Sequence, residues 1–530
     1  MKTSVILPIV LVAALVAALA AAILLSSAPR GSTWVYSDGV LTHKNTDWVL
    51  NVSLHSNASL TVTGIAVCPA GPSALSLADA VEGGYRITGI GDKAFSGCTD
   101  LTSVAIPTNV THIGKHAFSG NRNLSSVTLP VSVTSIGEAA FLGCRRLTSV
   151  TIPDGVTDIG NHVFSGCSRL AHVTIPDGVT RIGVLAFSYC TRLASVTIPD
   201  SVTSLDDAAF RGCFELSSVT IPSSMTNIGK GVFSECHDLT SMTIPGSITH
   251  IDQEVFAGRN SLTNVTLLAG VASIGEGAFR GCVDLTSVTI PDSVTSIGAV
   301  AFRGCSGLTS LVIPGSVAIV DNESFAGCSG LTNVAILAGV ASIGDGAFSG
   351  CDGLTSVTIP DSVTDIGNLS FFCCRNLSSI TIPGSVTRIG YGAFASSGLT
   401  SVTFSAGVAS IGNGAFSACT NLTCVTLPVG LTSVSKGTFL LCSGLTNAII
   451  PVGVTSIGKE AFAGCVSLTS VTIPDGVTSI GDAAFRDCSS LSSMVIPDSV
   501  ASIGKGAFSG DTRVIKQKTR GIEPQDTTRE

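Results

Sequence analysis

A period of 23 residues runs through most of the chain and constrains its fold more than any other feature. A unit close to LTSVTIPDSVTSIGxxAFxGCxx recurs in one register, with a single residue missing within residues 394–398. One such unit is too short to enclose a core, so its apolar side chains are buried only when neighbouring units stack. The sequence therefore predicts a solenoid of stacked coils. The leading leucines are Leu101, Leu124, Leu147, Leu170, Leu193, Leu216, Leu239, Leu262, Leu285, Leu308, Leu331, Leu354, Leu377, Leu399, Leu422, Leu445, Leu468 and Leu491.

The pattern inside each unit predicts how one coil is built. Leucine, valine and isoleucine alternate with serine and threonine in L-T-S-V-T-I, which is typical of a half-buried strand. Proline then ends the strand, because it cannot donate a backbone hydrogen bond and its fixed φ suits a turn. A second short strand, V-T-S-I, stops at glycine. The remaining x-x-A-F-x-G-C predicts a short helical or 3₁₀ turn with its phenylalanine pointing inward.

These units resemble those of the BspA-like, or Treponema pallidum-type, leucine-rich repeat proteins. The match is close in residues 468–488, LTSVTIPDGVTSIGDAAFRDC, and the segment WVYSDG at residues 34–39 resembles the start of that family's N-terminal cap. The resemblance implies a leucine-rich repeat solenoid over residues 85–510, with parallel β-strands on stacked coils, preceded by a cap segment at residues 31–84. Residues 511–530 are predicted to be a polar C-terminal tail. It also implies surface display and adhesion to host or matrix proteins or to other cells.

Residues 5–25 are almost uninterruptedly apolar and follow Lys2. About 20 apolar residues are enough to span a bilayer, which favours an uncleaved anchor, while the small residues that follow favour cleavage. Residues 1–28 are therefore predicted to be either a signal peptide or a signal anchor. Both outcomes place the rest of the chain outside the cytosol, at the cell surface or secreted, with membrane contact only through this segment.

The cysteines follow the repeat. Of the 18 cysteines, 15 lie three residues after the repeat phenylalanine. Equivalent side chains on adjacent coils stand about 4.8 Å apart, whereas the Cβ atoms of a disulfide prefer about 3.8 Å. Buried free thiols are therefore expected here, and Cys68, Cys373 and Cys424, which lie elsewhere, are the disulfide candidates. Asn121, Arg259, Ser397 and Asp511 replace cysteine in this ladder. Its members are Cys98, Cys144, Cys167, Cys190, Cys213, Cys236, Cys282, Cys305, Cys328, Cys351, Cys374, Cys419, Cys442, Cys465 and Cys488.

Catalytic, cofactor and metal sites find little support in the sequence. A net charge of −8 with 12% charged residues lacks the basic footprint that nucleic-acid binding needs. The eight histidines occupy differing repeat positions or the cap, without a consistent carboxylate or nucleophile partner. Aspartates after proline recur once per coil, as turn formers do, rather than in a dense calcium-binding cluster. The chain is therefore expected not to be an enzyme, to bind no cofactor or metal, and to have no nucleic-acid partner.

Serine and threonine on either side of the strand valine are expected to point outward and to form a ligand face. This face and the family resemblance predict an extracellular or cell-surface binding or adhesion module for a protein or glycan ligand. The alternative is a structural or ice-interacting solenoid without a protein ligand, because a regular Ser/Thr ladder resembles an ice-binding surface. The face is represented by Ser149, Thr151, His172, Thr174, Ser195, Thr197, Ser287, Thr289, Ser356 and Thr358.

Sequons for N-linked glycans are frequent in the chain. Several of them arise where asparagine replaces a serine or threonine of the repeat. The predicted acceptors are Asn51, Asn57, Asn109, Asn123, Asn264, Asn322, Asn368, Asn376 and Asn421.

Overall fold

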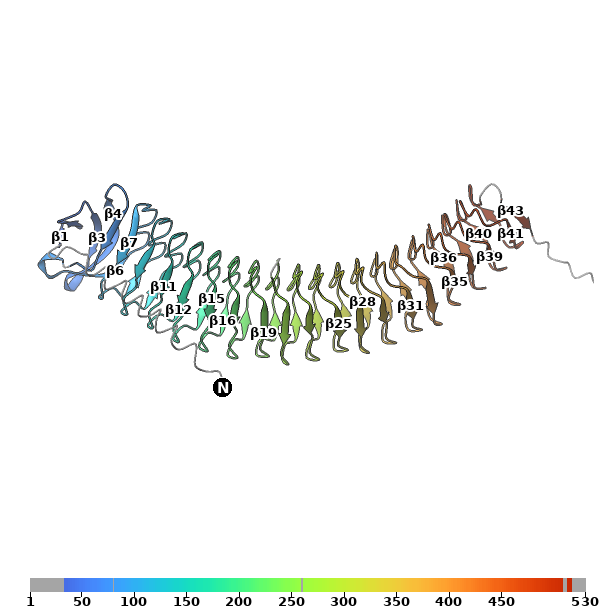
Figure 1. The fold of residues 1–530 in the computed structure, drawn as a ribbon, viewed down its shortest axis with the longest axis horizontal. Coiled ribbons are helices and arrows are strands. Elements are labelled where there is room, and N and C mark those ends of the chain that lie inside the picture. The colour runs from blue at the N-terminus through green and yellow to red at the C-terminus, as the bar shows by residue number, and fades with distance from the viewer. Residues whose placement is uncertain (1–32, 80, 259–260, 509–511, 517–530) are drawn as a thin grey trace, which may run out of the picture. The chain divides into compact units, whose positions relative to one another are not determined.

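The computed structural model describes residues 33–79, 81–258, 261–508 and 512–516. The predicted signal segment at residues 1–28, the ladder positions Arg259 and Asp511, and tail residues 517–530 lie outside the described part. The chain divides into two compact units, Met1–Leu239 and Thr240–Glu530. In each unit, successive coils lie side by side, and each coil contributes one loop of ribbon (Figure 1).

The first unit opens with an antiparallel cap that merges into the coils. The strands β1 to β4 pair in chain order, and β4 then pairs in parallel with β6, the first strand of the repeat. Trp34 and Trp48 are fully buried in this cap. The cap elements are β1 (Trp34–Ser37), β2 (Val40–His43), β3 (Val49–Leu54), η1 (Ser56–Ala58), β4 (Ser59–Val67), β5 (Ser73–Ser76) and η2 (Glu82–Gly84).

Each later coil of the first unit carries two short strands, and equivalent strands of neighbouring coils pair in parallel. The first strands come from L-T-S-V-T-I and are β7 (Leu101–Ala105), β9 (Ser126–Thr128), β11 (Ser149–Thr151), β13 (His172–Thr174), β15 (Ser195–Thr197) and β17 (Ser218–Thr220). The second strands are β6 (Arg86–Ile90), β8 (His112–Ile113), β10 (Ser135–Ile136), β12 (Asp158–Ile159), β14 (Arg181–Ile182), β16 (Ser204–Leu205) and β18 (Asn227–Ile228).

The second unit repeats this arrangement, and β43 (Arg513–Lys516) of the tail pairs in parallel with β41. Its first strands are β19 (Ser241–Ile244), β21 (Asn264–Leu267), β23 (Ser287–Thr289), β25 (Ser310–Ile313), β27 (Asn333–Ile336), β29 (Ser356–Thr358), β31 (Ser379–Ile382), β33 (Ser401–Phe404), β35 (Cys424–Thr426), β37 (Asn447–Ile449), β39 (Ser470–Thr472) and β41 (Ser493–Ile496). Its second strands are β20 (His250–Ile251), β22 (Ser273–Ile274), β24 (Ser296–Ile297), β26 (Ile319–Val320), β28 (Ser342–Ile343), β30 (Asp365–Ile366), β32 (Arg388–Ile389), β34 (Ser410–Ile411), β36 (Ser433–Val434), β38 (Ser456–Ile457), β40 (Ser479–Ile480) and β42 (Ser502–Ile503).

The repeat phenylalanines form the centre of the core, as the sequence predicts. Phe118 and Phe141 stack with ring centroids 5.3 Å apart and planes 4° apart, and both are fully buried. In the second unit, Phe348 and Phe371 stack in the same way at 5.3 Å. Because each repeat ring stacks on those of adjacent coils, the repeat rings within each unit form a continuous row rather than a single cluster.

The expected helical or 3₁₀ turn is a succession of tight turns instead. In one coil, the N–H groups of Ala140, Leu142 and Cys144 each bond to the carbonyl three residues earlier, while those of Ala139 and Phe141 bond to the next coil. The backbone of Ala139 is left-handed, with φ +55°. Because alternate amides serve the neighbouring coil, the segment cannot continue as a helix. The 3₁₀ helices found in the described residues, η1 and η2, both lie in the cap segment.

The glycine that ends the second strand permits close stacking. A Cβ atom built on Gly137 would lie 2.6 Å from the carbonyl carbon of Gly114 in the preceding coil. Real Cβ atoms do not approach backbone so closely, so the spacing of these two coils requires glycine at residue 137.

Candidate ligand face and side groove

The predicted ligand face is an exposed surface along the first strands. Ser149 and Thr151 on β11 are exposed on either side of the buried Val150. In the parallel register, Ser149 lies opposite His172 and Thr151 lies opposite Thr174. Since side chains alternate across a strand, the two outward positions form two parallel rows.

The remaining residues predicted for the face occupy the same two rows. Ser195 and Thr197 lie opposite Ser218 and Thr220, and in the second unit Asn264 lies opposite Ser287. Of the predicted residues, Ser149 and Thr151 on β11 lie directly opposite His172 and Thr174 on β13. The other predicted residues occupy the equivalent positions on strands that do not pair with each other. All are exposed: Ser149, Thr151, His172, Thr174, Ser195, Thr197, Ser287, Thr289, Ser356 and Thr358.

Two classes of threonine distinguish this face from the rest of the coil. The threonine after the leading leucine joins coils: the Thr355 hydroxyl donates to the Thr332 carbonyl at 3.0 Å. The threonine after the strand valine is different, because the hydroxyl of Thr358 has no hydrogen-bond partner among the described residues. The same holds for Ser149, Thr151, Ser195 and the other serines and threonines of the predicted face. Their hydroxyls remain available to a ligand.

The rows carry irregular substitutions. His172 and Asn264 are exposed where most coils have serine, and Cys424 is also exposed at that position. The Asn447 side chain is half-buried and accepts a hydrogen bond from Ser470 Oγ at 3.0 Å. The surface chemistry therefore differs from coil to coil while the backbone register is kept.

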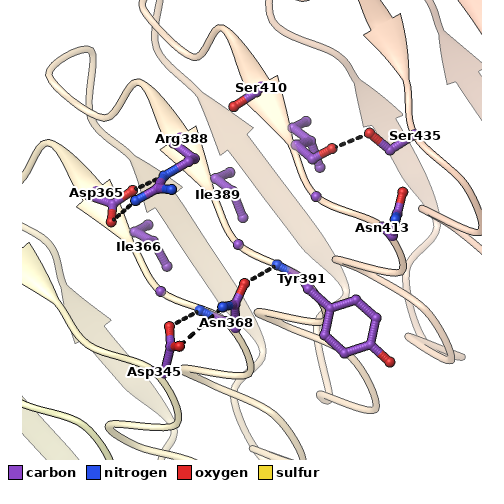
Figure 2. Close-up of a pocket in the computed structure, with 14 residues that line it drawn as sticks. Asp345, Asp365, Ile366, Asn368, Arg388, Ile389, Tyr391, Ser410, Asn413 and Ser435 are labelled. Carbon is purple, nitrogen blue, oxygen red and sulfur yellow. Dashed lines mark hydrogen bonds and ion pairs between the residues drawn. The ribbon is translucent and has the colours of Figure 1, made fainter.

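A shallow groove lies beside the second strands β30, β32 and β34, with a volume of about 400 Å³. Arg388 donates two hydrogen bonds to Asp365, at 2.6 and 2.8 Å, and this carboxylate raises the pKa of Arg388. Figure 2 shows this pair on one side of the groove and the Tyr391 ring projecting away from it. Asp365 is paired with Arg388, whereas Asp345 accepts hydrogen bonds from Asn368, so the groove offers a ligand hydrogen-bonding groups and the exposed tyrosine ring.

A row of Asn and Asp side chains, which we call the Asx row, joins the coils beside this groove. The oxygens of Asn322, Asp345 and Asn368 accept the backbone N–H of the equivalent residue in the next coil, at 2.9, 2.7 and 2.8 Å. Asn368 Nδ2 also donates to Asp345 at 3.1 Å. All three residues also line a second groove of about 630 Å³. The repeat consensus does not reveal this row, although Asn or Asp follows the repeat I-G or V-D pair in three successive units.

His43 has partners that its sequence position did not predict. In the cap, His43 contacts Asp79 through Nε2 at 3.2 Å and the Thr46 hydroxyl through Nδ1 at 2.8 Å. Its ring is buried and packs edge-on against Trp34, with centroids 4.8 Å apart. The arrangement ties the end of β2 to the segment that precedes η2. The contacts of His43 could not be predicted from sequence, because the cap has no repeat and repeat positions do not indicate which cap residues are in contact.

The cysteine ladder has a specific hydrogen-bonding role. Fourteen of its thiols donate to the backbone carbonyl of a phenylalanine in the preceding coil, at 3.1–3.3 Å. Asn121 replaces one cysteine and makes the equivalent bond, since its Nδ2 donates to Phe95 at 2.9 Å. Burial raises the pKa of Cys144 and Cys374 to about 12. These thiols are therefore neutral donors.

All the cysteines are free thiols in the structure. Of the disulfide candidates, Cys373 is half-buried and Cys424 is exposed, and neither contacts another sulfur among the described residues. Cys68 does: its Sγ lies 3.1 Å from Sγ of Cys98, the first member of the ladder.

The sequon asparagines lie at the surface. Asn123 is half-buried and its Nδ2 donates to the Thr99 carbonyl at 2.8 Å. Asn368 is exposed, yet its Nδ2 is engaged in the Asx row. The remaining exposed acceptors are Asn51, Asn57, Asn109, Asn264, Asn322, Asn376 and Asn421.

No group of three or more His, Cys, Asp or Glu side chains in the described part of the chain is arranged to hold a metal ion. No helix within the same residues is long and apolar enough to cross a membrane.

The coils, their parallel pairing and the phenylalanine row define a leucine-rich repeat β-solenoid. The chain belongs to the family of the BspA type leucine rich repeat region, which it matches over residues 83–194, 182–309, 295–423 and 409–518. Proteins of this kind generally serve as interaction modules and are typically not enzymes. The comparison with curated proteins found no match.

Several solved structures are similar to this chain. A leucine-rich repeat protein from Bacteroides ovatus is 25% identical, with 91% of this chain and 99% of that protein covered and a TM-score of 0.53. A leucine rich cell surface protein from Faecalibacterium prausnitzii is 26% identical, with coverages of 84% and 95% and a TM-score of 0.39. The Treponema pallidum leucine rich repeat protein is 24% identical, with coverages of 44% and 87% and a TM-score of 0.26.

Proposed function

We propose that this protein is a surface-displayed or secreted binding module whose Ser/Thr rows engage a protein or glycan of another cell or of the matrix. The observation that carries the proposal is the pair of exposed rows with unused hydroxyls, represented by Ser149 and Thr151 on β11. Parallel strands repeat these groups about every 4.8 Å. Ligands with repeated polar groups are therefore contacted at several coils at once.

Multivalent contact explains why a surface of weak single groups is sufficient. One exposed hydroxyl contributes little to affinity, because it exchanges a hydrogen bond with water for one with the ligand. When several coils engage one ligand, the later contacts form at a high effective concentration, and overall affinity rises by orders of magnitude. A long stack with many equivalent positions suits this mode of binding.

The interruptions of the rows favour a protein or glycan over a crystalline surface such as ice. His172, Asn264 and Ala335 break the Ser/Thr pattern at outward positions of the first strands. A lattice-matching surface requires regular spacing of identical groups, whereas recognition of a macromolecule uses differences between coils. The predicted ice-interacting alternative would give measurable thermal hysteresis, and we expect none.

Location outside the cytosol is part of the proposal and rests on the sequence. The apolar run at residues 5–25 and the resemblance to surface-displayed repeat proteins both favour export. Sequencing the N-terminus of the mature protein separates the two forms. A start near residue 29 indicates a cleaved signal peptide, and a start at residue 1 or 2 in a membrane fraction indicates an anchor.

The binding proposal is tested with the purified chain on immobilised collagen, immobilised laminin and a glycan array. Saturable binding to at least one surface is the expected result. Linear, nonsaturating signals on every surface, together with no binding to whole cells, would refute a role in adhesion.

A further inference from the structure

Cys98 differs from every other cysteine of the ladder. The other ladder thiols donate to a phenylalanine carbonyl of the preceding coil, as Cys144 does to Phe118 at 3.2 Å. Cys98 ends the partial unit before Leu101, and the chain has no repeat phenylalanine before Phe95. Its sulfur contacts the sulfur of Cys68 instead, at 3.1 Å.

The two cysteines sit where the cap meets the first coil. Cys68 directly follows β4, which pairs in parallel with β6, the first repeat strand. Cys98 follows the buried Phe95 and caps the turn of that same coil, since Leu101 N–H bonds to its carbonyl. The contact thus links two segments that are 30 residues apart in sequence and adjacent in space.

We propose that Cys68 and Cys98 are a redox modification site, at which a disulfide fastens the cap to the first coil. Two thiol sulfurs 3.1 Å apart need only a small rotation to reach the bond length of about 2.05 Å. The half-buried Cys68 is accessible to an oxidant, whereas Cys98 is buried. Cys68 is therefore the first sulfur to react.

The oxidant is a low-molecular-weight or protein disulfide, and the reaction is thiol–disulfide exchange. The Cys68 thiolate attacks one sulfur of the oxidant, and the first oxidant thiol leaves. Cys98 then loses its proton and attacks Cys68 Sγ in the mixed disulfide, so that the second oxidant thiol leaves. Two protein thiols are oxidised to one disulfide, and one oxidant disulfide is reduced to two thiols that carry the released protons.

To test this, the folded full chain is equilibrated with glutathione disulfide. The chain is then denatured and its remaining thiols are alkylated. Mass spectrometry is expected to count 16 cysteines that are either alkylated or carry glutathione, two fewer than the 18 cysteines of the chain. Tryptic digestion without reductant should yield residues 45–86 linked to residues 94–115, because these are the peptides that contain Cys68 and Cys98.

Two single variants serve as matched controls. Cys68→Ser should abolish the linked peptide and leave every remaining cysteine either alkylated or carrying glutathione, and its half-buried site keeps the effect on folding small. Cys424→Ser, at an exposed strand position, should leave the linkage intact. The proposal would be overturned if all 18 cysteines of the oxidised wild type were alkylated or carried glutathione, or if Cys68 were linked to a cysteine other than Cys98.

Discussion

The thiol of Cys144 donates a hydrogen bond to the carbonyl oxygen of Phe118, 26 residues earlier, at 3.2 Å. The same bond recurs from coil to coil, as between Cys374 and Phe348 at 3.2 Å. Each of the fourteen cysteines that make this bond joins its own coil to the preceding one and requires a proton to do so. This dependence on protonation makes the stability of the solenoid sensitive to alkaline pH.

We predict that alkaline pH lowers the free energy of unfolding. The pKa of Cys144 rises from its ordinary value of 9.0 to about 12 in the folded chain. Below pH 9 both states hold the proton, and above it the unfolded state loses the proton while the folded state keeps it. Stability is thus full below pH 9 and falls toward pH 12, by about 1.4 kcal/mol per pH unit for each such thiol.

Urea unfolding at about pH 8 and about pH 10.5 measures this effect, since the window lies between the two pKa values. The variant Cys144→Ala should be less stable than the wild type at both pH values. Its free energy of unfolding should fall less than that of the wild type between about pH 8 and about pH 10.5. Equal losses in the variant and the wild type would show that Cys144 does not carry the pH dependence.

Two adjacent phenylalanines in one coil should respond very differently to truncation. Phe371 is fully buried and stacks at 5.3 Å on both Phe348 and Phe394. Phe371→Ala is expected to cost about 3–5 kcal/mol, because it leaves a cavity in the core row. Phe372 is half-buried beside the second groove, and Phe372→Ala should cost about 1 kcal/mol or less. Urea unfolding compares the two, and a similar cost for both would be inconsistent with a core built on the repeat phenylalanine.

A matched pair of glycines tests the close approach of the coils. A Cβ on Gly137 would lie 2.6 Å from backbone, whereas a Cβ on the equivalent Gly160 would have its nearest neighbours at 3.8 Å. Gly137→Ala should therefore destabilise the chain by about 1–3 kcal/mol. Gly160→Ala should be neutral or stabilising by up to about 1 kcal/mol. If thermal unfolding gives the same change for both, close coil contact is not the reason for glycine.

The two classes of threonine should separate in a stability measurement. Thr355→Val removes the hydroxyl that donates to Thr332 and should cost about 0.5–1.5 kcal/mol. Thr358→Val, three residues later on the ligand face, removes a hydroxyl without a partner in the described residues and should change stability by less than about 0.5 kcal/mol. A larger cost at Thr358 than at Thr355 would reverse the assignment.

The period was enough to predict most of the fold. A residue such as Phe118 has its own equivalents as neighbours, so the register, the buried positions and the exposed rows follow from repeat position alone. The backbone conformation of the segment between the glycine that ends the second strand and the repeat cysteine could not be predicted from the period. Sequence indicated that this segment turns, but not that residues such as Ala139 are left-handed and share amides with the next coil.

Contacts that depend on particular substitutions or on the cap could not be predicted from the sequence either. The bonds of the Asx row require both an Asn or Asp side chain and a free amide in the next coil, as with Asn368 and Tyr391. The pairing of Cys68 with Cys98 and of His43 with Asp79 joins nonrepeat segments to distant residues. Their meeting depends on the tertiary path of the cap, and no repeat position encodes it.

The claim that the Ser/Thr rows form the ligand face is tested most directly with two triple variants of equal charge. One places lysine on the face, at Ser149, Ser287 and Ser356, and the other places lysine at the exposed second-strand serines Ser135, Ser296 and Ser502, which line neither groove. Affinity is measured by surface plasmon resonance on the matrix protein or glycan that the wild type binds. The face variant should bind at least about 10-fold more weakly, a loss of about 1.4 kcal/mol, while the second-strand variant stays within about twofold of wild type. Equal affinity of the two variants would contradict the assignment of the ligand face.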